Sequence, residues 1–313
     1  MGALGVAAVS VLCVVVLYAA LLTAVYVGRN KMVFPAAGSA VEPTTPGDGL
    51  LFEDLRIPVD EGTSVHAWWI PAGTDRLIGL DDTDDTDDSD DSTDQTTLLF
   101  FHGNGYALEQ QADREAPLLH KTGVNVLLVD YRGYGTSSPL RTSAESTAAD
   151  AQAALKYLIE VKGIAPKLIW IVGRSIGSVV ATTLASALAA PGSGTGSDTG
   201  SDPRPQCAGL ILLSPITNTT DVKPVKTLLR PLTWLRLAGD FDNHARIGSV
   251  RMPVLIIGGS RDTLASPWMA RALYARANDP KRIEMVEGAG HNDIWEVGQA
   301  HVLSAITEMI RAA

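Results

Sequence analysis

Strand-length apolar runs alternate along this chain with longer stretches of helical character, and this alternation constrains the fold more than any other feature. The apolar runs, several of them rich in Val and Ile, cover residues 98–101, 124–129, 168–172, 210–213 and 254–257. Helical character marks residues 144–161, 176–189, 267–277 and 293–311. Continuously apolar runs are typical of strands covered on both faces. We therefore predict an α/β fold with a mostly parallel central sheet and helices on both faces, entered through an antiparallel hairpin at 51–59 and 64–70.

The acidic character of the chain comes almost entirely from one segment. The formal net charge is −10, but nine aspartates lie between residues 81 and 94, and the remainder is close to neutral at −1. A nearly neutral folded part gives no indication of a nucleic-acid partner. Apolar residues make up 46% of the 313 residues, which is ample for a hydrophobic core.

The cysteines and histidines indicate neither disulfides nor a metal. Cys13 lies in an apolar segment, which leaves Cys207 without a partner for a disulfide. The histidines, at positions 66, 102, 120, 244, 291 and 301, show no metal-ligand spacing, and the sequence has no Cys-x-x-Cys pair. We predict no metal and no cofactor.

Residues 1–30 are predicted to form a single-pass membrane anchor. They include 27 consecutive uncharged residues, and a helix of that length, at about 1.5 Å per residue, exceeds the ~30 Å hydrocarbon core of a bilayer. A cleaved signal peptide is the alternative, but it requires a basic start and an apolar run of about half this length. Because Arg29 and Lys31 follow the uncharged run, the positive-inside rule places residues 31–313 in the cytosol.

Two low-complexity stretches are predicted to be disordered insertions in the domain formed by residues 31–313. Residues 81–96 repeat Asp-Asp-Thr/Ser, and like charges packed so densely repel one another and cannot bury surface. Calcium binding is the alternative for this stretch, but no glycine turn or terminal glutamate organises the carboxylates. Residues 191–205 are rich in Gly, Ser, Thr and Asp, which is the composition of a flexible segment.

The motif Gly173-Arg174-Ser175-Ile176-Gly177 stands between a predicted strand and a predicted helix. Glycines on both sides of the serine let the chain turn sharply and leave room around a side chain held on a strained turn. The G-x-S-x-G pattern alone occurs by chance, whereas its strand–turn–helix context is specific. A serine that caps the helix is the alternative. We predict that Ser175 is a nucleophile.

A nucleophilic serine needs a base and a group that orients the base. His291 follows a predicted strand and a glycine-rich loop, and it alone among the histidines has a suitable position. Asp262 comes just after the strand at 254–257, and the order Ser, Asp, His is the one expected for this motif. Asp221 is a second candidate for the acid. We predict Ser175, Asp262 and His291 as a catalytic triad.

Attack on a carbonyl also requires two backbone N–H groups to stabilise the negative oxygen that forms. One comes from the residue after the nucleophile, here Ile176, and the other from the loop after the third strand. That loop carries Gly103 and Gly105, which allow its backbone to approach a substrate closely. We predict Asn104 and Ile176 as the oxyanion-hole donors, with Gly105 as the next candidate after Asn104. His102 is predicted to be a structural residue that braces the loop.

Several motifs are shared with a known family. They are Phe101-His102-Gly103-Asn104-Gly105, Asp130-Tyr131-Arg132-Gly133-Tyr134-Gly135, Gly173-Arg174-Ser175-Ile176-Gly177, Leu213-Ser214-Pro215 and Gly288-Ala289-Gly290-His291-Asn292-Asp293. Together they resemble the membrane-anchored branch of the α/β-hydrolase-domain family, which is similar to serine aminopeptidase-type hydrolases and includes protein depalmitoylases. The resemblance runs from Phe34 to the C-terminus, apart from the insertions. It implies the α/β-hydrolase fold with a lid at 217–247, the same triad, and a bracing role for the block 130–135.

A serine at this turn favours acyl transfer to water through an acyl-enzyme, with esters, thioesters and amides all open as substrates. Between residues 223 and 236 the predicted lid has four basic residues and no acidic one, interleaved with Leu, Val and Trp, which suits contact with anionic lipid. An ordinary lid helix is the alternative. The basic lid segment and the predicted membrane anchor together favour an acyl-bearing lipid or an S-acylated protein as substrate. An amidase or aminopeptidase, and a membrane-tethered protein that binds without turnover, are the competing functions.

Overall fold

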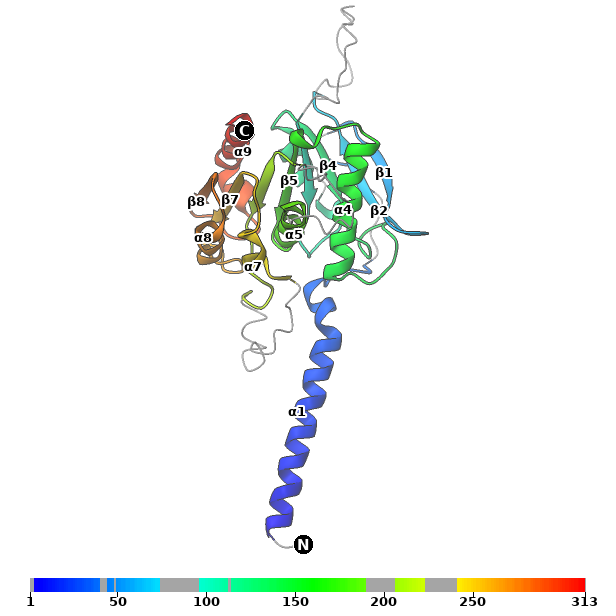
Figure 1. The fold of residues 1–313 in the computed structure, drawn as a ribbon, viewed down its shortest axis with the longest axis vertical. Helices are drawn as coiled ribbons and strands as arrows, with labels where there is room; N and C mark the ends of the chain where they lie inside the picture. The colour runs from blue at the N-terminus through cyan, green and yellow to red at the C-terminus, as the bar shows by residue number, and fades with distance from the viewer. Residues whose placement is uncertain are drawn as a thin grey trace, which may run out of the picture.

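The computed structural model describes residues 3–39, 44–47, 49–73, 96–111, 114–189, 206–222 and 241–312. Within these ranges the strands form one eight-stranded sheet in the order β1-β2-β4-β3-β5-β6-β7-β8 (Figure 1). The strands are β1 (Glu53–Pro58), β2 (Ser64–Ile70), β3 (Thr97–Phe101), β4 (Asn125–Val129), β5 (Ile169–Arg174), β6 (Gly209–Leu213), β7 (Val254–Gly259) and β8 (Lys281–Val286). β2 pairs with β1 and with β4 in antiparallel orientation, and the other neighbours are parallel. The predicted α/β fold, with a mostly parallel sheet and a leading hairpin, is confirmed.

Helices cover both faces of the sheet, as predicted (Figure 1). They are α2 (Leu108–Gln111), α3 (Glu115–His120), α4 (Ala144–Glu160), α5 (Gly177–Ala189), α7 (Asn243–Ile247), α8 (Pro267–Arg276) and α9 (Ile294–Ala312). Neighbouring strand residues belong to different hydrophobic clusters: Leu99 packs on the side of α4, α5 and α8, and Leu98 on the side of α3 and α9. Because both faces are covered, both sets of strand side chains are apolar, and this produces the continuous apolar runs of the sequence.

The long helices lie where the sequence predicts them, and two of them begin at recognisable start signals. The predicted helices at 144–161, 176–189, 267–277 and 293–311 correspond to α4, α5, α8 and α9 within one residue at each end. α4 begins at a capping box, in which Ser143 and Ser146 each accept a hydrogen bond from the other's backbone N–H. α8 begins with Pro267, which has no N–H to leave unsatisfied in the first turn.

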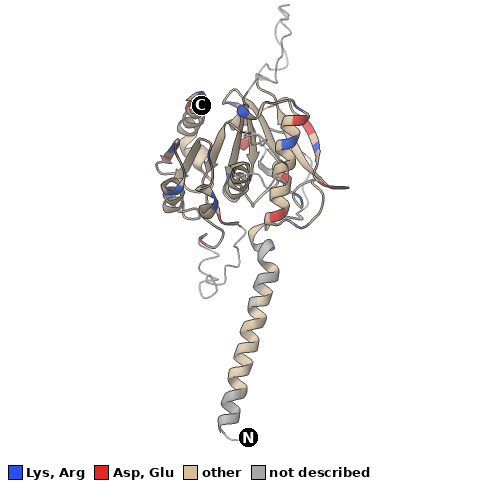
Figure 2. Cartoon of the chain, in the orientation of Figure 1, with Lys and Arg blue, Asp and Glu red and all other residues tan. Residues whose placement is uncertain are grey.

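Helix α1 (Ala3–Val33) extends away from the sheet and its covering helices (Figure 1). Its middle carries no charged residue (Figure 2), and its large apolar side chains are exposed, including Val11 at 63% and Leu17 at 70%. Within the part of the chain that the structure describes, no helix combines the length and the apolar character that crossing a membrane requires. The membrane anchor at residues 1–30 therefore stays a prediction.

Three predicted segments lie wholly or partly outside the described residues. The insertion at 191–205 does so entirely, and only Thr96 of the insertion at 81–96 is described. Residues 223–240 of the predicted lid, 217–247, also lie outside the described ranges, while both of its ends are described. The disorder of the insertions and the extent of the lid stay predictions.

Candidate active site

Ser175 occupies the turn between β5 and α5 with a backbone φ of +54°. This left-handed conformation is unfavourable for a residue with a Cβ and is characteristic of a nucleophile on a sharp strand-to-helix turn. A Cβ on Gly173 would lie 2.2 Å from the carbonyl oxygen of Gly177, and a Cβ on Gly177 would lie 2.1 Å from that of Phe101. Only glycine fits at either position, so the two glycines are what allow the chain to turn this tightly against β3.

The structure brings the three predicted triad residues together. His291 Nε2 lies 2.9 Å from Ser175 Oγ, and His291 Nδ1 lies 2.8 Å from Asp262 Oδ2. Asp262 is buried, and its other carboxylate oxygen accepts hydrogen bonds from the backbone N–H groups of Leu264 at 2.8 Å and Ala265 at 2.7 Å. With Nδ1–H donated to this fixed carboxylate, Nε2 is available to accept the serine proton.

Asp221, the second candidate for the acid, is engaged elsewhere. Its Oδ2 accepts hydrogen bonds from Thr217 Oγ1 at 2.7 Å and from Asn218 Nδ2 at 2.8 Å. These contacts stabilise the first turn of the predicted lid. The geometry therefore favours Asp262 as the acid that orients His291.

The loop after β3 lies against the nucleophile. A Cβ on Gly103 would be 3.5 Å from the Cβ of Ser175, so the loop backbone passes directly beside the serine. The carbonyl of Asn104 accepts a hydrogen bond from Tyr134 Oη at 2.9 Å, and the side chain of Asn104 donates to the Val33 carbonyl at 2.6 Å. These bonds fix the orientation of the loop at Asn104, while the donor roles of Asn104 and Ile176 stay predictions.

His102 braces this loop, as predicted. It is fully buried, with Nδ1 2.5 Å from the Gly103 carbonyl and Nε2 3.0 Å from Asp130 Oδ1. Tyr131 Oη donates a hydrogen bond of 2.7 Å to the His102 carbonyl. Burial raises the pKa of Tyr131 and of Tyr134, so both hydroxyls keep their protons and remain donors. The block that contains these tyrosines supports the loop, as the sequence indicated.

The end of α1 meets the same loop. Phe34 is 1% exposed and packs edge-on against the rings of Tyr131, Tyr134 and Phe241, with centroid distances of 5.4 to 6.3 Å. Together with the bond from Asn104 to the Val33 carbonyl, this packing makes the segment after α1 part of the support of the site. This contact could not be predicted from the sequence, because no local pattern links two segments about 70 positions apart.

Comparison with known proteins identifies the family. Residues 98–304 match the family described as the alpha/beta hydrolase family. This chain belongs to it. An uncharacterized protein of Mycobacterium tuberculosis is 30% identical over 267 residues, which cover 85% of this chain and 80% of that protein. Alpha/beta hydrolase domain-containing protein 17B of Homo sapiens is 34% identical over 204 residues, which cover 65% of this chain and 62% of that protein. A solved esterase of Pyrococcus furiosus superposes with a TM-score of 0.63 at 20% identity, over 87% of this chain and 95% of that one, and shares its fold.

In this α/β hydrolase, the residue before the nucleophile also holds the histidine loop. Arg174 Nη2 donates to the carbonyl of His291 at 3.2 Å, and Arg174 Nη1 lies 2.5 Å from Glu115 Oε1. Burial raises the pKa of Glu115, and the positive charge of Arg174 works against that rise. The buried pair thus ties α3, the serine turn and the His291 loop together. The roles of Arg174 and Glu115 could not be predicted from the sequence, because nothing in the motif indicates a partner 59 positions away.

Proposed function

We propose that this chain is a serine hydrolase that cleaves an acyl ester or thioester through an acyl-enzyme formed on Ser175. The observation that carries the proposal is the chain of two contacts from Ser175 Oγ through His291 to Asp262, at 2.9 and 2.8 Å. Such a chain activates a hydroxyl that is otherwise a poor nucleophile near neutral pH. The strained turn and the fixed oxyanion loop support the same assignment.

In the first half-reaction, Ser175 Oγ attacks the carbonyl carbon while His291 Nε2 accepts the hydroxyl proton. The Asp262 carboxylate stabilises the imidazolium, and the N–H groups of Ile176 and Asn104 stabilise the oxyanion. His291 then gives the proton to the leaving alcohol or thiol as the C–O or C–S bond breaks. In the second half-reaction, water gives a proton to His291 and attacks the acyl carbon; the free acid leaves and Ser175 regains its proton.

The substrate we propose is an acyl chain at a membrane, on a lipid or an S-acylated protein. Two features of α1 support this setting: its exposed apolar side chains, and its direct connection to the oxyanion loop through Val33 and Asn104. If residues 1–30 span a bilayer, the site lies close to the bilayer surface. Arg29 and Lys31 then favour the cytosolic side. The basic segment of the predicted lid and the resemblance to protein depalmitoylases favour the same substrates.

The first test is labelling of the detergent-solubilised full chain with a fluorophosphonate probe. Labelling is expected for the native protein and for Ser186→Ala, a matched control in α5 whose hydroxyl bonds only the Thr183 carbonyl among the described residues. Ser175→Ala and heat-denatured protein should show none. If well-folded native protein is not labelled, a membrane-tethered binding protein without turnover becomes the better account.

The second test compares an acyl ester, a thioester and an amide of the same chain length in detergent-free vesicles. We expect the ester or the thioester to be hydrolysed at least tenfold faster than the amide. Faster amide cleavage, in particular of a substrate with a free amino terminus, would favour the amidase or aminopeptidase alternative.

A further inference from the structure

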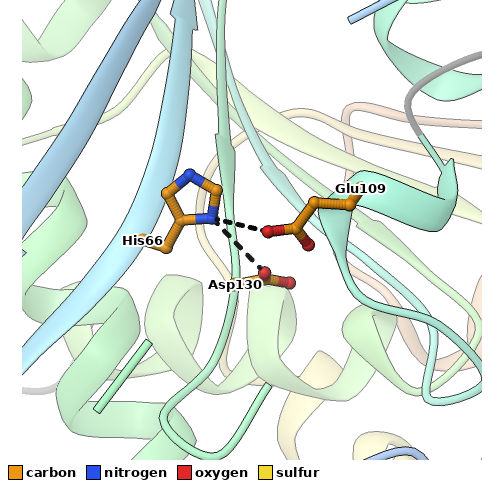
Figure 3. A group of neighbouring side chains, drawn as sticks. All are labelled: His66, Glu109 and Asp130. Atoms are coloured by element: carbon orange, nitrogen blue, oxygen red, sulfur yellow. Dashed lines mark ion pairs between the residues drawn. The ribbon is translucent and has the colours of Figure 1, made fainter. Parts of the chain in front are cut away.

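Three buried side chains from different elements converge on one another (Figure 3). His66 lies on β2, Glu109 on α2, and Asp130 directly after β4. His66 Nδ1 is 3.5 Å from Glu109 Oε1 and 3.7 Å from Asp130 Oδ2, and one ligand atom from each residue lies within 4.8 Å of the other two. The residues are 3%, 9% and 0% exposed. The group is therefore shielded from solvent.

Each of the three side chains has one buried atom without a hydrogen-bond partner. Among the residues that the structure describes, His66 Nδ1, Glu109 Oε2 and Asp130 Oδ2 are buried and make no hydrogen bond. A buried polar atom without a partner costs about 1–3 kcal/mol, and more where it is charged. A Cβ on Gly135 would lie 2.3 Å from Asp130 Oδ2 and 2.8 Å from Glu109 Oε2, so both oxygens border one small space that glycine leaves open. An unsatisfied atom on each of three converging side chains indicates a ligand between them.

Other groups hold the far sides of the same side chains. His66 Nε2 is 2.7 Å from Asp54 Oδ1. Asp130 Oδ1 accepts a hydrogen bond from the Leu108 N–H at 3.0 Å and lies 3.0 Å from His102 Nε2. A carboxylate that binds the far nitrogen of a histidine is the usual means of orienting a metal-binding imidazole. With Nε2–H donated to Asp54, His66 Nδ1 directs its lone pair toward the two carboxylates.

Two carboxylates buried side by side also need a positive charge. A divalent cation would neutralise both carboxylates and give all three side chains a shared partner.

We propose that His66, Glu109 and Asp130 bind one divalent transition-metal ion, for which zinc is the best fit, with water as the fourth ligand. Zinc binds histidine nitrogen and carboxylate oxygen at about 2.0–2.2 Å in a tetrahedron, whose corners are then about 3.4 Å apart. His66 Nδ1 lies 3.5 Å from Glu109 Oε1 and 3.7 Å from Asp130 Oδ2, in agreement with this spacing. Because Asp130 also supports His102, the ion stiffens the oxyanion loop and takes no part in bond cleavage. This proposal does not depend on the proposed function.

The test is zinc binding to the full chain in detergent, after removal of metals with dipicolinate. Titration of zinc against a chromophoric chelator should give one site per chain. Glu109→Gln keeps the shape of the side chain and should weaken zinc binding by at least 100-fold. Asp54→Asn, at a side chain that is 65% exposed, should weaken it by about 10- to 100-fold. Glu284→Gln, which alters a surface pair with His301, should leave zinc binding unchanged.

Thermal unfolding gives a second readout that does not rely on the chelator. Zinc should raise the Tm of the native protein and of Glu284→Gln, but not that of Glu109→Gln. Folded native protein that binds no stoichiometric zinc at micromolar concentration would overturn the proposal, and so would a Glu109→Gln variant with native zinc affinity. In the first case a proton shared by the three side chains is what satisfies the cluster.

Discussion

The backbone of Ser175 illustrates how a site residue can work against stability. Its φ of +54° places a residue with a Cβ in the left-handed region, which costs about 1–2 kcal/mol. The surrounding structure enforces this conformation, since the Ser175 N–H donates to the Leu213 carbonyl at 2.9 Å and glycines stand two residues away on either side. The strain exposes the hydroxyl at the end of β5, which a relaxed strand-to-helix connection would not do.

We therefore predict that Ser175→Gly is more stable than Ser175→Ala by about 1 kcal/mol, because glycine adopts a positive φ without strain. Both variants should be inactive. Ser186 in the interior of α5 provides the matched control with the opposite sign: there glycine should be less stable than alanine by about 1 kcal/mol. Urea unfolding of the four full-length variants in detergent measures the differences. Equal stability of the two Ser175 variants would contradict the strain argument.

A second prediction at this scale separates the two candidate acids. Asp262→Asn should lower kcat for a chromogenic acyl ester by about 10⁴-fold, because an amide in this position favours the wrong tautomer of His291. Asp221→Asn should lower it by less than about tenfold, since Asp221 bonds the start of the predicted lid. Similar losses in both variants would sink the assignment of Asp262.

At the scale of elements, α4 is linked to the block after β4 through one buried carboxylate. Asp150 accepts hydrogen bonds from the backbone N–H of Arg132 at 2.9 Å and from its side-chain Nε at 2.5 Å. The same arginine reaches the exposed Asp60 at 2.8 Å. The block after β4 carries Tyr131 and Tyr134, whose hydroxyls donate hydrogen bonds to the oxyanion loop. The link from α4 to Arg132 therefore contributes to holding the site in place.

The protonation of Asp150 leads to a pH prediction. Burial raises its pKa to about 6, although the hydrogen bonds from Arg132 lower it. Between about pH 4 and 6, the folded state therefore holds a proton that the unfolded state has lost; the stability due to this proton is present below pH 4 and is lost as the pH rises through 6. Asparagine cannot ionise, so Asp150→Asn should gain on the order of 3 kcal/mol relative to the native protein between pH 4 and 7. Urea unfolding of Asp150→Asn and of the native protein across this range measures the change, and a difference that stays flat would contradict the prediction.

The elements that could be predicted from the sequence are those whose signals are local. The inner strands β3 to β7 are mostly apolar because helices cover both faces of the sheet. Ser175, Asp262 and His291 each follow their own strand in a fixed order. The His66 cluster could not be predicted in this way. Its residues meet because β2 and β4 pair with Ala67 opposite Val129, which sets His66 beside Asp130. That register is a property of the folded sheet, so no local spacing of ligand residues in the sequence indicates this site.

At the scale of the whole molecule, the chain separates into a compact α/β domain and an apolar helix that leads away from it (Figure 1). Apolar side chains along α1, among them Leu12 and Val16, are 62% and 58% exposed. Exposed apolar surface of this extent is unfavourable in water and marks contact with a lipid or a protein partner. The contact of Phe34 and Val33 with the oxyanion loop then connects whatever α1 binds to the position of the active site.

The last prediction tests whether that partner is a bilayer. Each aspartate in the middle of a membrane span costs about 2.5–3.5 kcal/mol, so the double variant Leu12→Asp/Val16→Asp should be released from vesicles by alkaline carbonate while the native protein stays bound. Val161→Asp, a charge at an apolar residue that is 65% exposed on the domain, is the control and should stay bound. Because the domain itself is unaltered, the double variant should hydrolyse a soluble short-chain ester within about twofold of the native rate. It should lose at least tenfold toward a vesicle-embedded acyl substrate, since the anchor no longer concentrates enzyme and substrate on one surface. Native protein that carbonate extracts, or a double variant equally active on both substrates, would show that α1 serves a protein partner instead.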